Sequence, residues 1–294
     1  MLGAIIGDVA GSIYEVLEVS YQKKNHVPRP YEERIKILDK NTPLFTKECC
    51  ITDDSILTCA IYDAIKYGDC EYEGYLRDYG KNELLNGPDN FGRSRFGKGF
   101  KEWLEGDFQG KSFGNGSAMR ISAVGFLFDD LESVEKNSYL ATIPSHNHEE
   151  SIKAAEAVST SIFLLRNGFS KEAVINYIKS NYYDLNYDLD YLQHSNTFSS
   201  KASVSVPQAF YIFSISNDFE DSIRKAISIG GDSDTIAAIV GSLSESYYGI
   251  PEELKKQVKP YLRDYMYDLL KDRYYKNEKR KDFTWKNTKQ KKNS

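Results

Sequence analysis

The chain has 294 residues, of which 40% are hydrophobic and 28% are charged, and its formal net charge is −5. This composition is typical of a globular protein and excludes the collagen-like and disordered classes. No uninterrupted apolar run reaches the roughly 18 residues that a membrane-spanning helix needs.

The charge is unevenly distributed along the chain. Residues 272–294 carry nine Lys or Arg and three Asp or Glu, about +6, so the rest carries about −11. A body this acidic excludes a broad nucleic-acid interface. We expect 1–275 to form one domain and 276–294 to be a solvated basic tail, with a nucleic-acid tether as the alternative role of the tail.

The cysteines and the N-terminus indicate a cytoplasmic protein. The four cysteines lie within 22 residues and lack paired CxxC spacing; they are Cys49, Cys50, Cys59 and Cys70. This pattern favours reduced thiols over a disulfide framework or a structural zinc site. The first fifteen residues are apolar but lack a basic start and contain Asp8, which disfavours a signal peptide.

Helical periodicity dominates the chain in order. Gly3, Gly7 and Gly11 recur every four residues, which leaves one face of a first helix bare for close packing in a core. Residues 20–50 and 72–113 are rich in Gly, Asn and Tyr, and predict ordered loops or short helices. Apolar spacing predicts further helices at 54–67, 121–128, 149–166, 170–181, 207–216, 219–229, 235–249 and 255–270.

Local signals support several of these helix boundaries. Ser170 suits a helix cap, Pro207 suits a first turn, and Gly249 suits a helix end. Strand alternation is weak throughout, and we find no linker and no internal repeat. The sequence therefore predicts one compact all-α domain.

Two clusters of oxygen ligands each stand where a predicted helix begins. They are Thr52, Asp53 and Asp54 in ITDDS, and Asp232, Asp234 and Thr235 in GGDSDT. Either cluster alone is explained as a helix cap. Together they offer four carboxylates, which would repel one another unless a cation lay between them. Oxygen ligands suit Mg²⁺, Mn²⁺ or Ca²⁺ rather than zinc, and six ligands with four negative charges match two divalent ions.

Two further acids lie on the first helix. Asp8 and Glu15 are seven residues apart and therefore share roughly one face. They could point at a common centre, or each could be a surface or capping group.

Two other stretches carry polar groups in front of predicted helices. In SFGNGSAMR, residues 112–120, the glycines around Asn115 suit either a diphosphate cradle or an ordinary tight turn. In SHNHEE, residues 145–150, His146 and His148 suit substrate contact or a structural role; zinc lacks a third ligand of suitable spacing. No P-loop or GxGxxG motif is present.

The order GAIIGDVAGSIYE, TDDS, SFGNGSAMR, SHNHE, SVPQAF and GGDSDT resembles the ADP-ribosylglycohydrolase family over residues 1–255. The resemblance implies an all-α fold with two Mg²⁺ or Mn²⁺ ions in a cleft. It implies metal ligands at Thr52, Asp53, Asp54, Asp232, Asp234 and Thr235, with Asp234 bridging. It also implies that Glu15 is a mobile metal ligand and the first catalytic candidate, with Asp53 the second.

The resemblance further implies a substrate-binding set. Its phosphate-binding loop falls on Lys111, Ser112, Phe113, Gly114, Asn115 and Gly116, and its substrate-side histidine on His146. Phe113 and Phe210 match aromatic or apolar positions that line its ADP-ribose pocket. The chain departs from the family at Ser145, where a threonine is usual, and at Glu149, where proline or glycine is usual. These positions bear on substrate identity more than on the metals.

The implied activity is metal-dependent hydrolysis of the bond between ADP-ribose and an acceptor on a protein or small molecule, by a monomer. Serine, arginine, nucleobase, acetyl and poly-ADP-ribose acceptors remain open, and the GDVAGSIYE spelling favours O-linked ones. The alternatives are a binuclear phosphohydrolase of a nucleotide sugar and a non-catalytic, crystallin-like ADP-ribose binder.

Overall fold

The computed structural model describes residues 1–88, 92 and 94–275. These residues form α-helices, two short 3₁₀ helices and no β-strand, so the predicted all-α class is confirmed. Within this part of the chain no helix is long and apolar enough to cross a membrane. The tail predicted at 276–294 lies outside the described residues.

The helices follow one another with short connections. The α-helices are α1 Leu2–Asn25, α2 Tyr31–Arg34, α3 Asp53–Tyr67, α4 Tyr72–Leu85, α5 Lys98–Glu105, α6 Gly116–Arg120, α7 Ser122–Leu127, α8 Leu131–His146, α9 Glu149–Arg166, α10 Lys171–Asn181, α11 Leu189–Ser195, α12 Ala202–Ile215, α13 Phe219–Ser228, α14 Ser233–Tyr248, α15 Glu252–Val258 and α16 Asp264–Tyr274. The 3₁₀ helices are η1 Ile35–Leu38 and η2 Lys259–Tyr261.

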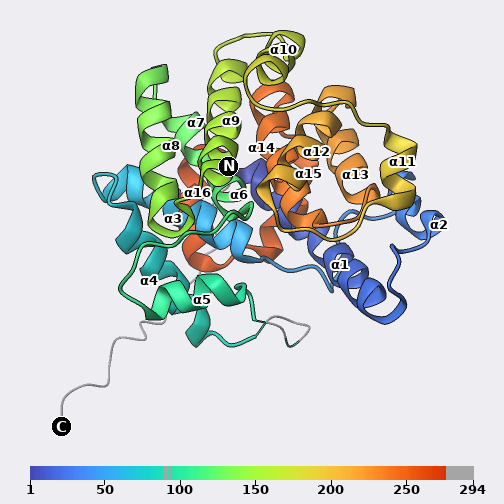
Figure 1. Ribbon diagram of the computed structural model, residues 1–294, viewed down its shortest axis with the longest axis horizontal. Helices are drawn as coiled ribbons and strands as arrows, with labels where there is room; N and C mark the ends of the chain where they lie inside the picture. Colours follow the sequence, from blue (N-terminus) through green and yellow to red (C-terminus); the bar gives the residue numbers. More distant parts are fainter. Residues whose placement is uncertain (89–91, 93, 276–294) are drawn as a thin grey trace.

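The centre of the fold is the crossing of α1 and α14, which lie side by side in the middle of Figure 1. A Cβ atom at Gly3 would overlap the carbonyl of Gly241, and one at Gly7 would overlap the carbonyl of Ala237. At Gly11 it would lie 2.5 Å from Cα of Asp234. The bare face predicted for the first helix is therefore where the two backbones meet. This contact places the acids of α1 beside the start of α14.

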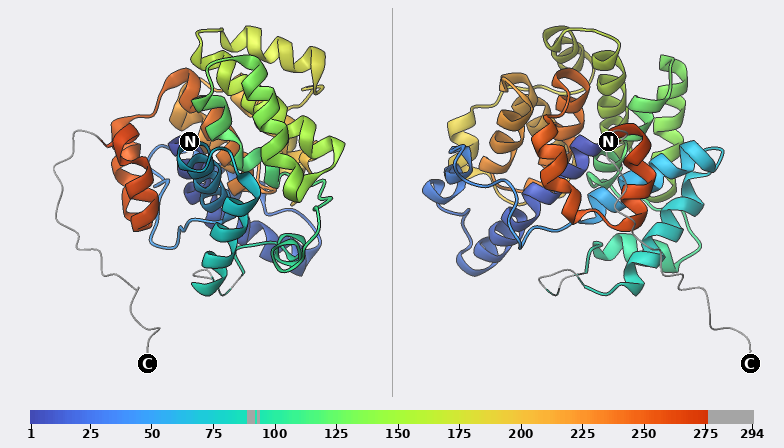
Figure 2. Two further views of the ribbon diagram at one scale, coloured as in Figure 1. Left: turned by 90° about the vertical axis from the view of Figure 1, so that its left-hand side faces the viewer. Right: turned by 180° about the vertical axis from the view of Figure 1, so that it is seen from behind.

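Other helices surround this pair in a single globule. α9 packs on α7, α8 and α14. α14 also contacts α12 and α13, while α3 packs on α1 and α6. The C-terminal α16, red in Figure 2, lies on the outside of the bundle and contacts α3. The starts of α3, α6 and α14 thereby come close together.

Most predicted helices occur with the expected ends. α14 ends at Gly249, which has a φ of 73°, and Ser170 caps α10 by accepting a hydrogen bond from Ala173 N. α3, α9 and α13 also match the predicted ranges within one residue. Local capping signals were sufficient for these boundaries.

Two predicted helices were wrong in extent. The helix predicted at 255–270 is two helices separated by η2, because Pro260 has no N–H to donate and Leu262 is extended. The helix predicted at 207–216 begins at Ala202, so Pro207 lies inside it and not in its first turn. The helix predicted at 121–128 is α7 within one residue at each end, and a separate short helix, α6, precedes it from Gly116.

The α1–α14 crossing can be tested with Gly7→Ala. The added Cβ meets a backbone carbonyl that cannot rotate away, so we expect the free energy of unfolding in urea to fall by about 1–3 kcal/mol or more. Gly99→Ala is the matched control, since Gly99 lies in α5 with nothing within 4 Å of its Cβ position, and its stability should not fall. Equal stability of Gly7→Ala and the unaltered protein would contradict the close crossing.

Candidate functional site

The structure brings the predicted site stretches together around one cavity of about 700 Å³. Its wall includes Glu15 of α1, the starts of α3 and α14, the loop before α6 and the end of α8. The predicted residues that line it are Glu15, Thr52, Asp53, Asp54, Lys111, Ser112, Gly114, Asn115, Gly116, His146, Asp232, Asp234 and Thr235. Residues far apart in sequence thus share one concave site.

Asp8 of α1 holds the start of α3 in place. Its buried carboxylate accepts hydrogen bonds from Thr52 N at 3.0 Å and Thr52 Oγ1 at 2.7 Å. It also accepts from Ser55 N at 3.1 Å and from the Ser55 hydroxyl. The sequence left open whether Asp8 was a capping group, and it caps a helix other than its own. Asp8 therefore fixes the orientation of the TDDS turn.

The carboxylates form two overlapping groups. Asp8, Asp54 and Asp234 each offer an oxygen within 4.8 Å of the others, and Glu15, Asp232 and Asp234 do the same. Asp234 belongs to both groups, which is the position that a bridging ligand would take. Asp53 lines the cavity, half-buried, but belongs to neither group.

The two threonines bind the same carboxylate oxygen. Thr52 Oγ1 lies 3.1 Å and Thr235 Oγ1 lies 3.3 Å from Asp54 Oδ2. The start of α3 is thereby joined to the start of α14. The six metal ligands proposed from the sequence remain a prediction, but their side chains lie in one neighbourhood.

Burial and mutual repulsion raise the pKa values of these acids. Burial, and then the nearby Asp8, raise the pKa of Asp53 to about 8. Burial and Glu15 raise the pKa of Asp232 to about 7. The pKa values of Asp54 and Asp234 are raised well above their ordinary range by burial and then by neighbouring carboxylates. The arrangement is thus electrostatically unfavourable when all the acids are ionised.

The donor set fits a hard divalent cation. Every ligand in the two groups is a carboxylate oxygen, and Asp54 Oδ1 is buried with no hydrogen-bond partner. A buried oxygen without a partner is costly unless something else binds it. A divalent cation would satisfy that atom and offset the repulsion among the carboxylates.

Asn115 links the glycine-rich loop to the acidic centre. Its Nδ2 donates to Asp232 Oδ2 at 2.7 Å and to Ser205 Oγ at 2.9 Å. Asn115 is buried, and the sequence predicted it only as part of a phosphate-binding loop. The side chain therefore positions a carboxylate, which the loop pattern alone did not indicate.

The backbone of this loop is already partly paired within the protein. Ser112 N donates to Ser145 O at 3.4 Å, Gly114 N to Ser112 Oγ at 3.1 Å, and Asn115 N to Ser200 O at 2.9 Å. A diphosphate held here would therefore bind the remaining N–H groups, those of Phe113 and Gly116, and the side chain of Lys111. Fewer backbone N–H groups of residues 112–116 are therefore available to a diphosphate than the sequence suggested.

The two histidines have separate roles. His148 caps α9, because its Nδ1 accepts a hydrogen bond from Glu150 N at 3.2 Å. His146 lines the cavity, and a Cβ atom at Gly116 would lie 2.7 Å from its Nε2. Neither of the acidic groups contains a histidine. The geometry favours a cavity-side His146 and a structural His148 over a shared zinc site.

Arg120 and Ser145 set the hydrogen bonding of His146. Arg120 Nη2 donates to Ser145 Oγ at 2.9 Å, and Ser145 Oγ lies 2.7 Å from His146 Nδ1. Burial, and then the charge of Arg120, hold the pKa of His146 well below its ordinary value. The low pKa favours the neutral ring, and Ser145 Oγ, which accepts from Arg120, can donate its own proton to Nδ1. We infer this tautomer. His146 therefore presents Nε2–H to the cavity.

The structure does not bring the two predicted aromatic residues into the cavity wall. Phe210 is fully buried in the core, with its ring centroid 6.5 Å from that of Tyr183. Phe113 is 51% exposed, and its ring packs near that of His148. Motif position alone does not indicate how deeply a side chain is buried, and Phe210 lies on a face of α12 that packs in the core. The apolar part of the wall comes instead from Phe96, Phe100, Trp103, Phe108 and Phe198.

Comparisons with known proteins identify relatives of the whole chain. The family model described as ADP-ribosylglycohydrolase matches residues 1–282. An uncharacterised protein of Archaeoglobus fulgidus is 25% identical over 92% of each chain. ADP-ribosylhydrolase ARH3 of Mus musculus is 24% identical over 86% of this chain and 83% of its own. ARH3 of Bos taurus is 22% identical over 89% of this chain and 88% of its own.

A solved structure shows the same fold. The chain titled ADP-ribosylglycohydrolase-related protein complex superposes with a TM-score of 0.57 at 20% identity, over 76% of this chain and 81% of that chain.

Metal binding should depend on pH in a defined direction. Because the pKa values of Asp53 and Asp232 are raised in the folded state, the native protein holds protons that the unfolded chain releases between about pH 4 and pH 8. The stability contributed by these acids in the metal-free protein thus falls as pH rises through that window. A cation must displace the same protons, so its affinity should rise with pH.

We therefore expect Mg²⁺ to raise the thermal unfolding midpoint more near about pH 8 than near about pH 5.5. The measurement is the midpoint with EDTA and with Mg²⁺ at each pH, so that other titrating groups cancel. Asp234→Asn should reduce the Mg²⁺ effect at both values. An equal Mg²⁺ effect at the two pH values would argue against the acidic groups as the binding site.

Proposed function

The chain belongs to the ADP-ribosylglycohydrolase family, and we propose that it is a metal-dependent hydrolase that cleaves the bond between C1″ of ADP-ribose and an acceptor, releasing ADP-ribose. The family assignment supports ADP-ribose hydrolysis in general. The observation that carries the specific proposal is the convergence of Asp54, Asp232 and Asp234 with Glu15 in the wall of one cavity.

We propose that the cavity binds two Mg²⁺ ions, for which Mn²⁺ can substitute. The residues that would hold them are Glu15, Thr52, Asp53, Asp54, Asp232, Asp234 and Thr235. Bound ions of this kind supply Lewis acidity toward water and fix the 2″ and 3″ hydroxyls of the ribose. This role is supported by the all-oxygen donor set and by the unpartnered Asp54 Oδ1.

Glu15 is the proposed acid–base residue or mobile ligand. It is half-buried in the cavity wall, and its carboxylate lies with Asp232 and Asp234. It stands one helical turn after the close crossing of α1 and α14, so its backbone is held while its side chain reaches the cavity. Asp53 is the second candidate, because its side chain lines the cavity beside the proposed metal ligands.

The rest of the substrate would lie along the loop and the far wall. Lys111, at an exposed position, and the N–H groups of Phe113 and Gly116 are the proposed diphosphate contacts. Neutral His146 would donate a hydrogen bond from Nε2 to an oxygen of the substrate. Phe96, Phe100 and Phe108 give the cavity an apolar surface that suits the face of a base or a sugar.

The acceptor and the compartment belong to the same proposal. We propose an ADP-ribosylated protein or a small-molecule conjugate as the substrate, with O-linked acceptors favoured, and a monomeric enzyme. The free thiols of Cys49, Cys50, Cys59 and Cys70 support a reducing, cytoplasmic compartment.

A release assay tests the activity. The protein is incubated with Ser-, Arg- and DNA-linked ADP-ribose and with O-acetyl-ADP-ribose, in Mg²⁺ or in EDTA, and the products are identified. We expect free ADP-ribose from one substrate, only with Mg²⁺. Asp234→Asn should lower kcat/KM more than about 100-fold, since even outer-shell changes at metal sites cost about 10–100-fold.

Asp218→Asn is the matched control, because Asp218 also starts a helix but caps α13 away from the cavity. It should retain the activity of the unaltered protein. AMP and ribose phosphate as products would instead establish a phosphohydrolase. No product, with ADP-ribose binding intact, would establish a binder.

The hydrogen bond between Ser145 and His146 gives a second test. Ser145→Ala removes the hydroxyl that fixes the ring, so we expect KM to rise about threefold to tenfold, the equivalent of about 0.5–1.5 kcal/mol. The change in kcat should be smaller, because His146 binds substrate and does not transfer the proton. Ser145→Thr keeps the hydroxyl and should retain the original KM. An unchanged KM in Ser145→Ala would remove His146 from the substrate site.

A further inference from the structure

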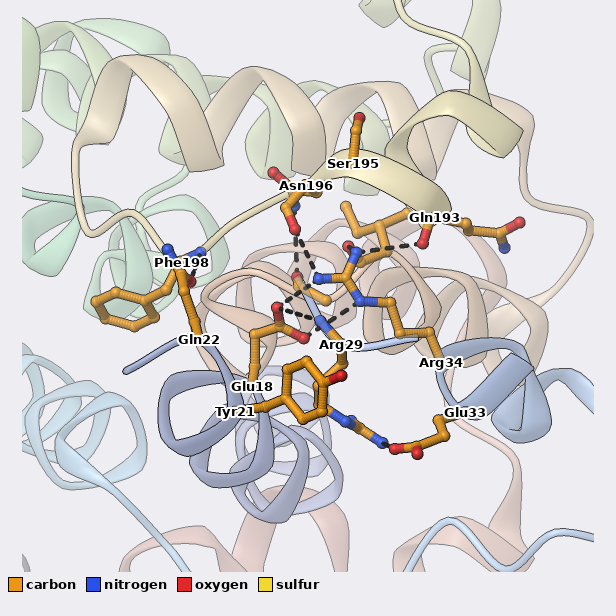
Figure 3. Close-up of polar contacts among 12 residues, drawn as sticks. Glu18, Tyr21, Gln22, Arg29, Glu33, Arg34, Gln193, Ser195, Asn196 and Phe198 are labelled. Atoms are coloured by element: carbon orange, nitrogen blue, oxygen red, sulfur yellow. Dashed lines mark hydrogen bonds and ion pairs between the residues drawn. The ribbon is translucent and has the colours of Figure 1, made fainter. Parts of the chain in front are cut away.

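A buried ion pair lies beneath the GGDSDT turn, outside the cavity. Arg34 of α2 and Glu18 of α1 are 1% and 0% exposed, and Figure 3 shows the guanidinium between α1 and the loop after α11. Arg34 Nε donates to Glu18 Oε2 at 3.2 Å, and Arg34 Nη2 donates to Glu18 Oε1. Neither residue belongs to a motif that the sequence singled out.

The other donors of Arg34 bind backbone carbonyls from two separate segments. Nη1 donates to Gln193 O at 3.2 Å and to Ile229 O at 3.4 Å, and Nη2 donates to Asn196 O at 2.6 Å. The five N–H groups of the guanidinium thus have five acceptor contacts. Such a fully paired arginine is geometrically rigid, because its donors lie in one plane.

The guanidinium also fills the space beside the turn itself. Gly230 has a φ of 66°, and a Cβ there would lie 2.7 Å from Arg34 Cζ. Gly231 has a φ of 73°, and a Cβ there would lie 2.6 Å from Asn196 Nδ2. Asn196 Nδ2 also reaches Gly230 O at 3.5 Å. The two glycines therefore fit against Arg34 and Asn196, immediately before Asp232.

The same network reaches the wall of the cavity. One helical turn beyond Glu18, Gln22 Oε1 accepts a hydrogen bond from Phe198 N at 3.0 Å, and Phe198 lines the cavity. Along α1, Glu15 faces the acidic centre, Glu18 binds Arg34, and Gln22 binds the wall segment. α1 therefore carries a proposed metal ligand, Glu15, and also the residues that bind Arg34 and the cavity wall.

We propose that Arg34 is a positioning residue that fixes the GGDSDT turn, and with it Asp232 and Asp234, in a geometry ready to bind the metal. This rests on the proposed function, in which those acids are ligands. Its charge is neutralised by Glu18 and not by the acids of the cavity, so it orients them without competing with a cation. Outer partners of this kind tune metal affinity without touching the ion.

The experiment measures Mn²⁺ affinity on the full chain, from the free Mn²⁺ signal in electron paramagnetic resonance, with thermal unfolding in EDTA as the second readout. We expect Arg34→Met to weaken Mn²⁺ binding about 10–100-fold. Arg34→Lys should recover part of that loss, since it restores the charge but not the planar set of donors.

Arg224→Met is the matched control. Arg224 is also buried and donates to the carbonyls of Ile37, Asp39 and Thr42, but none of its hydrogen bonds reaches the GGDSDT turn. It should lose comparable thermal stability while its Mn²⁺ affinity stays within about twofold of the original. The contrast separates positioning of the site from general support of the fold.

Asn196→Ala keeps the inference testable if Arg34→Met does not fold. It leaves the ion pair in place and removes the side-chain contacts with Gly230 O and with Gln208, and a Mn²⁺ affinity weakened several-fold supports the inference. Unchanged affinity in a folded Arg34→Met, or in Asn196→Ala where Arg34→Met does not fold, would overturn it. Mn²⁺ binding that depends on Arg34, without ADP-ribose release from any substrate, would overturn the proposed function alone. No Mn²⁺ binding by the unaltered protein would overturn both.

Discussion

The rest of the structure depends on the backbone contact between α1 and α14. Two helices can approach this closely only where side chains are absent, and Gly3, Gly7 and Gly241 supply that absence. Glycine within a helix costs about 0.5–1 kcal/mol relative to alanine, and each of these positions carries that cost. In return, the close contact fixes the position of α14 relative to α1, since Gly11 lies against Asp234 itself. A wider crossing would move Asp8 and Glu15 away from the acids at the start of α14.

The acidic centre opposes folding, and the surrounding residues show how the protein accommodates it. Asp8 accepts four hydrogen bonds from the TDDS turn, and Asn115 donates to Asp232. These neutral donors stabilise carboxylates without occupying the space between them. The buried arginines follow the same rule: Arg34 pairs with Glu18, and Arg120 binds Ala141 O and Ser145. Positive charge is kept beside the site, and the centre remains negative.

The sequence predicted those features that are determined locally. Helix caps, glycine ends and the two acidic turns all follow from a few neighbouring residues, and the family resemblance ordered them into one site. The features that failed or were missed depend on tertiary placement. Phe210 occupies a motif position but faces the core, and Arg34 carries no local signal because its acceptors are carbonyls of distant segments. Pro260 was visible in the sequence, but the apolar spacing around it continued across the break.

The cost of the acidic centre bears on whether this protein is an enzyme or only binds ADP-ribose. A binder needs a cavity, a loop that contacts the diphosphate and an apolar wall, and none of these requires buried carboxylates close enough to raise one another's pKa values. Asp54 Oδ1 is moreover buried without a partner, which is unfavourable in the absence of a cation. A protein that did not bind a cation would be more stable without one of the acids in these two groups. The grouping of Asp8, Glu15, Asp54, Asp232 and Asp234 in one neighbourhood therefore favours a site that binds a cation, as the proposed hydrolysis requires, over a cavity that binds ADP-ribose alone.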